Sequence, residues 1–163
     1  MVIKMDKNPT RKKNRLENFN YSEKGDYFVT ICVKDRKNVF WKNNYADIGE
    51  KDIHLFYNQN GNVADQIIQN INVTQKDNVN IEKFAIMPDH IHMIVSICHE
   101  NEFSLENIVR FLKRQITIET GLKDLWQKSF YDHIIRNQKD YDEVWEYIDA
   151  NPRKKTGNIF LND

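Results

Sequence analysis

Two histidines separated by one residue, His90 and His92, stand in the segment Met87-Pro88-Asp89-His90-Ile91-His92-Met93-Ile94-Val95. The apolar run that follows them predicts a strand, and alternation along a strand directs both imidazoles to one face. Neutral imidazole binds divalent metals well, so the pair predicts a metal site on a rigid element. On spacing alone, such a pair is more often two polar residues on the solvent-facing side of a sheet.

A second set of candidate residues lies near the end of the chain. The spacing predicts a helix from about residue 139 to 150, ended by a proline at 152, with a buried stripe formed by Tyr141, Val144, Trp145 and Ile148. Tyr147 and Asn151 lie one turn apart and project from the edge of that stripe. If the helix covers the face of His90 and His92, two imidazoles and an amide surround a divalent metal beside a phenol. Mg²⁺ or Mn²⁺ in such a site polarises a scissile phosphate.

These residue types also have ordinary structural roles. A helix tyrosine commonly packs at the rim of a core, and an asparagine before a proline commonly marks a helix end. A phenol with a pKa near ~10 is a poor nucleophile at neutral pH unless a metal or a base assists its deprotonation. The residues alone therefore leave open whether Tyr147 attacks or packs.

The bulk composition predicts one globular domain. The chain has 163 residues, 40% of them hydrophobic, with 24 basic and 24 acidic side chains. Neither a membrane span nor a signal peptide is predicted, so we expect a cytoplasmic protein without membrane contact. Cys32 and Cys98 have no metal-binding spacing, and we expect them to be reduced and buried.

The elements that must position the candidate residues follow from periodicity and caps. Strands are predicted at residues 27–33 and 79–86, the second forming a hairpin with the His-x-His strand, and a short strand lies within 125–136. One helix runs through residues 63–71, and another is capped by Ser104 and stopped by Gly121. This order predicts an α+β fold, an antiparallel sheet with helices packed on it, of ferredoxin-like character.

Basic residues near the N-terminus are candidates for contacts with phosphate. Residues 1–15, which we expect to form a flexible arm before a single domain at 16–163, include Arg11, Lys12, Lys13 and Arg15. A charged terminus is as often a solvated tail. Elsewhere, Lys113, Arg114 and Arg136 could extend a phosphate track and Trp126 could stack on a base. Trp126 is also compatible with the core, and Arg136 with an ion pair.

Four motifs in order along the chain resemble those of the REP-associated tyrosine transposases. These are single-tyrosine members of the HUH (His-hydrophobic-His) endonuclease superfamily, related to bacterial insertion-sequence transposases. The matching segments are residues 21–31 after the basic stretch, 87–92 with the HUH strand, 126–137, and 147–152 with the catalytic helix. The match extends over nearly the whole chain, although the zero net charge departs from the basic proteins expected of the family.

The resemblance implies a fold, a reaction and a role for each matching residue. The fold is the ferredoxin-like, RRM-like HUH domain. His90 and His92, with Asn151 as third ligand, would hold Mg²⁺ or Mn²⁺. Tyr147 would attack single-stranded or hairpin DNA, giving a 5′-phosphotyrosine link and a free 3′-OH, ahead of Tyr131 and Tyr141 as rival nucleophiles.

Two other functions remain open from the sequence. The same sheet could serve a noncatalytic nucleic-acid-binding module that needs neither a metal nor Tyr147. It could also serve a metal-dependent phosphodiesterase in which water attacks and no covalent adduct forms. The oligomeric state, homodimer or monomer, is undecided as well.

Overall fold

The computed structural model describes residues 21, 23–45, 52–100 and 103–155. Its elements are, in chain order, β1 (Gly25–Cys32), η1 (Lys34–Arg36), η3 (Ile53–Phe56), α1 (Gln59–Thr74), β2 (Val79–Ile86), β3 (His90–Ile97), α2 (Leu105–Thr120), β4 (Tyr131–Ile135) and α3 (Gln138–Lys155). The predicted N-terminal arm, with Arg11, Lys12, Lys13 and Arg15, lies outside the described residues.

The strands form one sheet in the order β2-β3-β1-β4, with every neighbouring pair antiparallel. The predicted hairpin between β2 and β3 is confirmed, with Ile86 opposite Ile91 next to the turn. Strand order and connections are those of a ferredoxin-like fold with one added helix, α3. The predicted α+β class is therefore confirmed.

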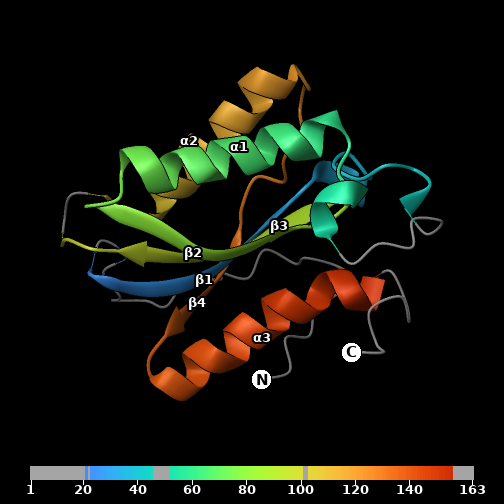
Figure 1. Ribbon diagram of the computed structural model, residues 1–163. Coiled ribbons are helices and arrows are strands. Elements are labelled where there is room, and N and C mark those ends of the chain that lie inside the picture. The colour runs from blue at the N-terminus through green and yellow to red at the C-terminus, as the bar shows by residue number, and fades with distance from the viewer. Residues whose placement is uncertain (1–20, 22, 46–51, 101–102, 156–163) are drawn as a thin grey trace.

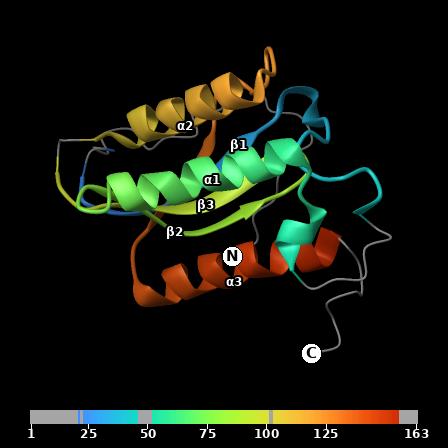
Figure 2. The same ribbon diagram turned by 45° about the horizontal axis from the view of Figure 1, so that its top comes forward.

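Helices cover both faces of the sheet (Figure 1). α1 and α2 lie together on one face and α3 crosses the other, which the turned view in Figure 2 also shows. Successive residues of β3 point to alternate faces: Ile91, Met93 and Val95 are fully buried toward α1 and α2. His90, His92 and Ile94 therefore face α3.

Side chains of the predicted types begin and end the helices. Ser104 Oγ accepts a hydrogen bond of 3.2 Å from the Asn107 N–H at the start of α2, a typical N-cap. Gly121 ends α2 with a left-handed φ of 69°, a conformation that glycine adopts at little cost. Asn58 caps α1 through a bond from the Gly61 N–H.

The last helix differs from its prediction in length and in its buried face. It continues through Pro152 to Lys155, and its buried residues are Val144, Ile148 and Pro152, which follow one another at i+4 spacing. The proline ring packs inward near the helix end, so continuing the helix past it forgoes one backbone bond to Ile148. Trp145, predicted in the stripe, is 37% exposed; it lies against Tyr141 and below the ammonium of Lys83.

An ion pair ties α3 to the sheet. Lys83 Nζ on β2 donates to Asp149 Oδ1 at 2.7 Å. This contact lies two residues beyond Tyr147 and helps to hold that part of α3 over the sheet.

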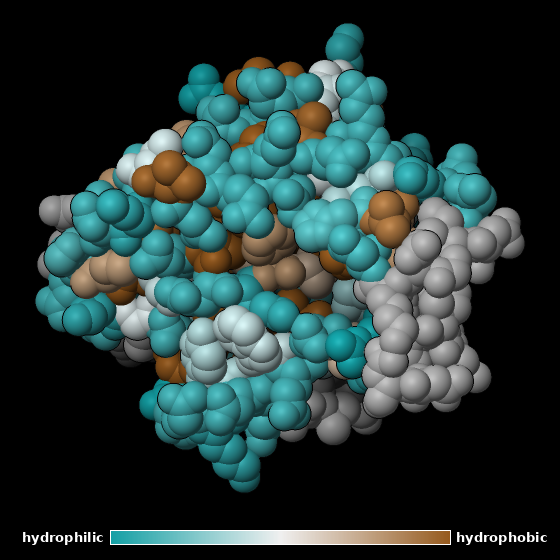
Figure 3. All heavy atoms as spheres, in the orientation of Figure 1, coloured by the Kyte–Doolittle hydropathy of each residue, from teal (hydrophilic) through white to brown (hydrophobic). Residues whose placement is uncertain are grey.

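The face of the molecule shown in Figure 3 is mostly hydrophilic. In Figure 3, hydrophilic residues cover α1 and α3, and hydrophobic colour gathers in the band between them. Within the described ranges, no helix is long and apolar enough to cross a membrane. Cys32 and Cys98 are free, as predicted, but half-buried rather than buried.

Candidate active site

The histidine pair lies on β3, on the face of the sheet that α3 covers. Of the His90 surface 9% is exposed, and of the His92 surface 1%, so the alternative of two solvent-facing polar residues is wrong. The Nε2 atoms of the two rings approach to 3.0 Å. Two nitrogens that occupy adjacent octahedral positions at ~2.1 Å from one metal also lie ~3.0 Å apart, so the pair fits a metal ion.

Thr30 on β1 fixes the orientation of His92. The two residues are direct partners across the β1–β3 ladder, and Thr30 Oγ1 lies 2.7 Å from His92 Nδ1. A hydroxyl can donate or accept, so it satisfies either neutral tautomer of His92; in the tautomer whose Nδ1–H donates to Thr30, Nε2 carries the lone pair that can bind a metal. Burial, followed by the charges of His90 and Arg36, lowers the pKa of His92 well below its ordinary value. His92 is therefore held as a neutral ligand.

Asp89 occupies the corresponding place beside His90. Its Oδ1 lies 2.6 Å from His90 Nδ1, and its Oδ2 accepts a bond of 2.9 Å from Arg36 Nε. Burial raises the pKa of Asp89, but the bonds and charges of His90 and Arg36 outweigh burial and hold that pKa below its ordinary value. The carboxylate thus remains ionised beside the imidazole.

Further ligands of a metal would have to be neutral groups, water or substrate. In the described part of the chain, no group of three or more His, Cys, Asp or Glu side chains could hold a metal ion. The two imidazoles would therefore form a partial coordination shell with open positions, the arrangement of catalytic rather than structural sites.

The phenol of Tyr147 reaches the histidine pair from α3. Its ring centre lies 5.3 Å from that of His92 and 5.8 Å from that of Phe28, which it meets edge-on. Phe28, fully buried on β1, also stacks on His92 at 5.6 Å. Phe28 therefore contacts both rings and holds the Tyr147 ring in position beside His92. The Lys154 ammonium lies 6.0 Å from the Tyr147 ring.

The two rival tyrosines are placed differently. Tyr131 is on the edge strand β4 and is 37% exposed. Its ring centre lies 6.2 Å from that of Phe28. Burial, then the charges of Asp132 and Tyr147, raises its pKa, which disfavours a phenolate nucleophile. Tyr141 lines a groove with Asp26, Ser96 and Arg136. Asp26 precedes Thr30 by four strand residues, ~13 Å, so Tyr141 lies at the opposite end of α3 from the histidines.

Asn151 lies one turn beyond Tyr147, half-buried as predicted for the edge of the stripe. Its Nδ2 donates to the Tyr147 carbonyl at 2.8 Å. That bond orients the amide and leaves Oδ1, the atom that binds hard cations, for another partner. Its role as third ligand stays a prediction.

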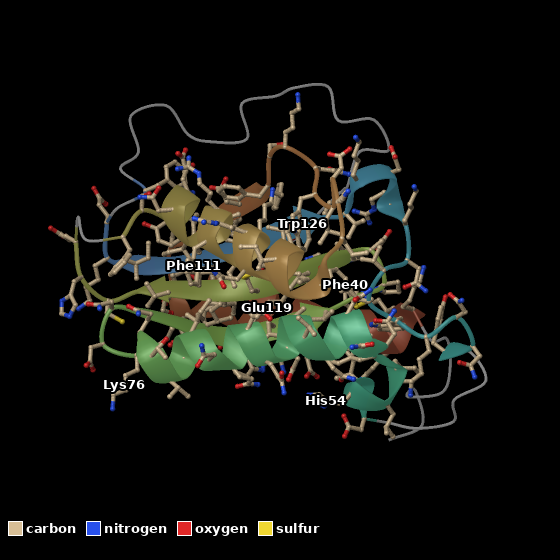
Figure 4. All side chains as sticks on the ribbon, turned by 90° about the horizontal axis from the view of Figure 1, so that it is seen from above. Phe40, His54, Lys76, Phe111, Glu119 and Trp126 are labelled. Atoms are coloured by element: carbon tan, nitrogen blue, oxygen red, sulfur yellow. The ribbon has the colours of Figure 1, made fainter. Side chains whose placement is uncertain are left out.

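The residues predicted to contact DNA are not gathered at this site. Lys113 and Arg114 are on α2, across the sheet from α3 (Figure 1). Lys113 Nζ donates to the Gln127 and Ser129 carbonyls, and Trp126 Nε1 donates to the Lys113 carbonyl. Trp126 also packs beside Phe40, and Figure 4 shows both near one end of α2. Arg136 is exposed before α3. Contact of these residues with DNA stays a prediction.

Several residues that shape the site were missed from the sequence. They are Phe28, Thr30, Arg36 and Asp89, and Lys154 was seen only as one of a basic cluster. Thr30 and Phe28 share the strand parity that points toward α3, so alternation along β1 could have placed them on the histidine face. Asp89 directly precedes the first histidine, but Arg36 has no sequence signal because a loop brings it there.

Comparison with known proteins places this site in context. No family model matches the chain. A protein of Haemophilus influenzae (strain ATCC 51907 / DSM 11121 / KW20 / Rd), named only as uncharacterized, is 31% identical over 87% of this chain and 88% of its own length. A REP-associated tyrosine transposase of Escherichia coli (strain K12) is 38% identical over 45% of this chain, and the match spans only 44% of that protein. A solved REP-associated tyrosine transposase bound to a REP hairpin has a TM-score of 0.62 at 26% identity, covering 86% of this chain and 74% of that one.

Proposed function

Because the chain belongs to the family of REP-associated tyrosine transposases, we propose that it is a DNA transposase that cuts and rejoins single-stranded or hairpin DNA through Tyr147. The observation that carries this proposal is the contact of Tyr147 with His92, at 5.3 Å between ring centres, beside two imidazole Nε2 atoms 3.0 Å apart. The proposed nucleophile and the candidate metal site are thus adjacent, although β3 and α3 are far apart in the sequence.

The proposed step is a transfer of one phosphodiester bond. The Tyr147 oxygen loses its proton and attacks phosphorus, the new P–O(Tyr) bond forms, and the P–O3′ bond breaks. The leaving O3′ takes up a proton and becomes a free 3′-OH. The 5′-phosphate stays on the tyrosine, and attack by a 3′-OH reverses the step. Since one ester replaces another, rejoining requires no outside energy source.

The protein side chains would divide the work of this step. His90, His92 and Asn151 would hold Mg²⁺ or Mn²⁺, which when bound supplies charge neutralisation and polarisation at the scissile phosphate. Thr30 and Asp89 hold the imidazoles in place, and Phe28 fixes the Tyr147 ring against His92. The Lys154 ammonium, 6.0 Å from the centre of the Tyr147 ring, would add positive charge beside the nucleophile.

The substrate follows from the relatives. The solved neighbour is bound to a REP hairpin, and we propose hairpin DNA with single-stranded flanks as the partner of this chain. Action on such DNA would require a cytoplasmic location, which we propose for this protein.

A label-transfer assay tests the proposal. Hairpin oligonucleotides with randomised single-stranded flanks carry one fluorophore at the 3′ end and another at the 5′ end, and are incubated with protein and Mg²⁺, Mn²⁺ or EDTA. A 5′-phosphotyrosine link predicts that only the 3′ label comigrates with the protein on a denaturing gel, while the 5′ label is released on a fragment ending in 3′-OH. Tyr147→Phe should abolish the protein band, and EDTA should do the same.

Matched variants separate the alternatives. Tyr131→Phe and Tyr141→Phe should retain the band, because neither phenol is placed like that of Tyr147. Metal-dependent cleavage without any protein-bound label would indicate attack by water. Hairpin binding without cleavage, unchanged in Tyr147→Phe and in EDTA, would indicate a noncatalytic binding module.

A further inference from the structure

The segment that follows β1, which contains η1, contacts the His90 ring on its Nδ1 side. η1 follows β1 directly, and Cys32, the last residue of β1, is the ladder partner of His90. Backbone bonds lock this loop to the start of β3: the Val33 N–H donates to the Asp89 carbonyl at 2.9 Å, and the Val39 N–H to the Pro88 carbonyl at 2.9 Å. The loop and the segment that carries the histidine are therefore one unit.

Arg36 makes three contacts at this edge. Its Nε donates to Asp89 Oδ2 at 2.9 Å, one terminal nitrogen donates to Cys32 Sγ at 2.9 Å, and the other lies 3.4 Å from His90 Nδ1. The guanidinium thus spans both residues that flank the imidazole. A planar group with fixed donors is suited to orient a carboxylate.

The loop adopts an unfavourable backbone conformation to place this side chain. Asp35 and Arg36 have φ values of 59° and 53°, the left-handed region that costs conformational energy for residues other than glycine. Such outliers concentrate where a fixed geometry serves a function. Here the geometry that they deliver is the contact of Arg36 with Asp89.

The shortest of these contacts, between Asp89 and His90, decides which ring nitrogen carries a proton, and the Arg36 nitrogen 3.4 Å from His90 Nδ1, itself a donor, then makes a charge contact rather than a hydrogen bond. A carboxylate paired with a guanidinium accepts but does not donate, so Asp89 Oδ1 at 2.6 Å requires a proton on His90 Nδ1. The form of an imidazole that binds a metal is neutral and has one N–H, so in that form His90 Nε2 carries the lone pair, 3.0 Å from His92 Nε2.

We propose that Arg36 and Asp89 form a positioning pair that sets the His90 tautomer and directs its Nε2 lone pair into the metal site. This inference rests on the proposed metal-dependent function. Arg36 acts through Asp89 and touches neither metal nor substrate. Groups that orient a ligating histidine typically change metal affinity by about 10- to 100-fold when they are lost.

The test reads the tautomer and the metal affinity separately. Long-range ¹H–¹⁵N NMR of the metal-free protein, labelled at its five histidines and assigned with single-histidine variants, should show His90 protonated on Nδ1. Asp89→Asn should shift His90 toward a mixture of tautomers and raise the Kd for Mn²⁺, measured by calorimetry, by about 10- to 100-fold. Arg36→Gln should change both in the same direction but less, and should add little in the Asp89→Asn background.

A nearby ion pair supplies the control. Lys34, two residues before Arg36 in η1, pairs with Asp124 from the segment between α2 and β4, so Lys34→Gln removes a charge from the same loop and should leave the tautomer and the Kd unchanged. Asp89→Glu, which keeps the carboxylate, serves as the second variant if Asp89→Asn unfolds. Unchanged tautomer and Kd in Asp89→Asn, an equal effect of Lys34→Gln, or additive effects of Arg36→Gln and Asp89→Asn would overturn the inference. A wild type that binds no Mn²⁺ would instead contradict the proposed metal dependence, and the tautomer would still decide the role of the pair.

Discussion

His92 illustrates how surroundings convert an ordinary residue into a ligand. It is 1% exposed, stacked on Phe28 and bonded through Nδ1 to Thr30. Burial lowers its pKa, so the ring is neutral near neutral pH and one of its nitrogens carries a lone pair. A fixed neutral imidazole, with its far nitrogen already satisfied, has little orientational freedom to lose when it binds a metal.

The Lys154 side chain lies over the Tyr147 ring, and its removal gives a testable prediction. Its ammonium, 6.0 Å from the ring centre, would favour negative charge on the attacked phosphate. Lys154→Met should slow cleavage by about two- to fivefold, equivalent to the ~0.5–1 kcal/mol of an exposed cation–π contact. Single-turnover cleavage of a labelled hairpin measures the rate constant.

Lys155 provides the matched control for that prediction. It is the next residue on α3 and is exposed, so Lys155→Met removes the same charge without the ring contact. Equal slowing in both variants would attribute the effect to general attraction of DNA and would contradict a specific role of Lys154.

At the scale of elements, α1 depends on a glycine at its first turn. A Cβ on Gly61 would lie 2.4 Å from the Phe40 carbonyl oxygen and 2.9 Å from Tyr57 Cβ. Gly61→Ala should therefore destabilise the protein by about 1–3 kcal/mol, the usual cost of overpacking, although alanine is the better helix former. Urea unfolding monitored by circular dichroism measures the change.

Gln66→Ala is the control on the same helix. Gln66 is exposed, so its replacement should change the free energy of unfolding by less than about 0.5 kcal/mol. A Gly61→Ala protein as stable as the wild type would show that the loop carrying Phe40 moves aside freely.

Most elements were predictable from the sequence because their signals are local. Ser104 and Gly121 mark α2 through cap chemistry, and the β2–β3 hairpin follows from two strand patterns around Pro88. The face and length of α3 were not, because they depend on how the helix docks. Helical spacing allows a buried face that includes Trp145 as well as one that includes Pro152. Only the position of the sheet decides which face is buried.

The candidate site was predictable only in part for the same reason. The parity of β3 placed His90 and His92 on one face, and helical spacing placed Tyr147 and Asn151 at the edge of a stripe. Their meeting depends on α3 crossing the sheet, and the contacts of Arg36 depend on two left-handed residues in a loop. Neither feature leaves a pattern in a single sequence.

At the scale of the whole molecule, the proposed activity is a product of the three-layer arrangement. The sheet holds the histidines, and α3 brings Tyr147 over them from the layer that α1 and α2 do not occupy (Figure 2). The Lys83–Asp149 pair and the buried residues Val144 and Ile148 hold that helix in place. The central claim is therefore that this docked tyrosine, rather than water or another phenol, attacks DNA.

The most direct test identifies the amino acid that carries the DNA. The protein is incubated with metal and a hairpin whose 5′ fragment is short enough to dissociate after cleavage, so that the covalent species accumulates. After nuclease and trypsin digestion, mass spectrometry locates the residual 5′-nucleotide. We expect it to be attached to Tyr147 in the peptide that spans residues 140–153. Attachment to Tyr141 in that peptide, attachment to Tyr131 in the peptide that spans 129–136, or cleavage without any modified tyrosine would contradict it.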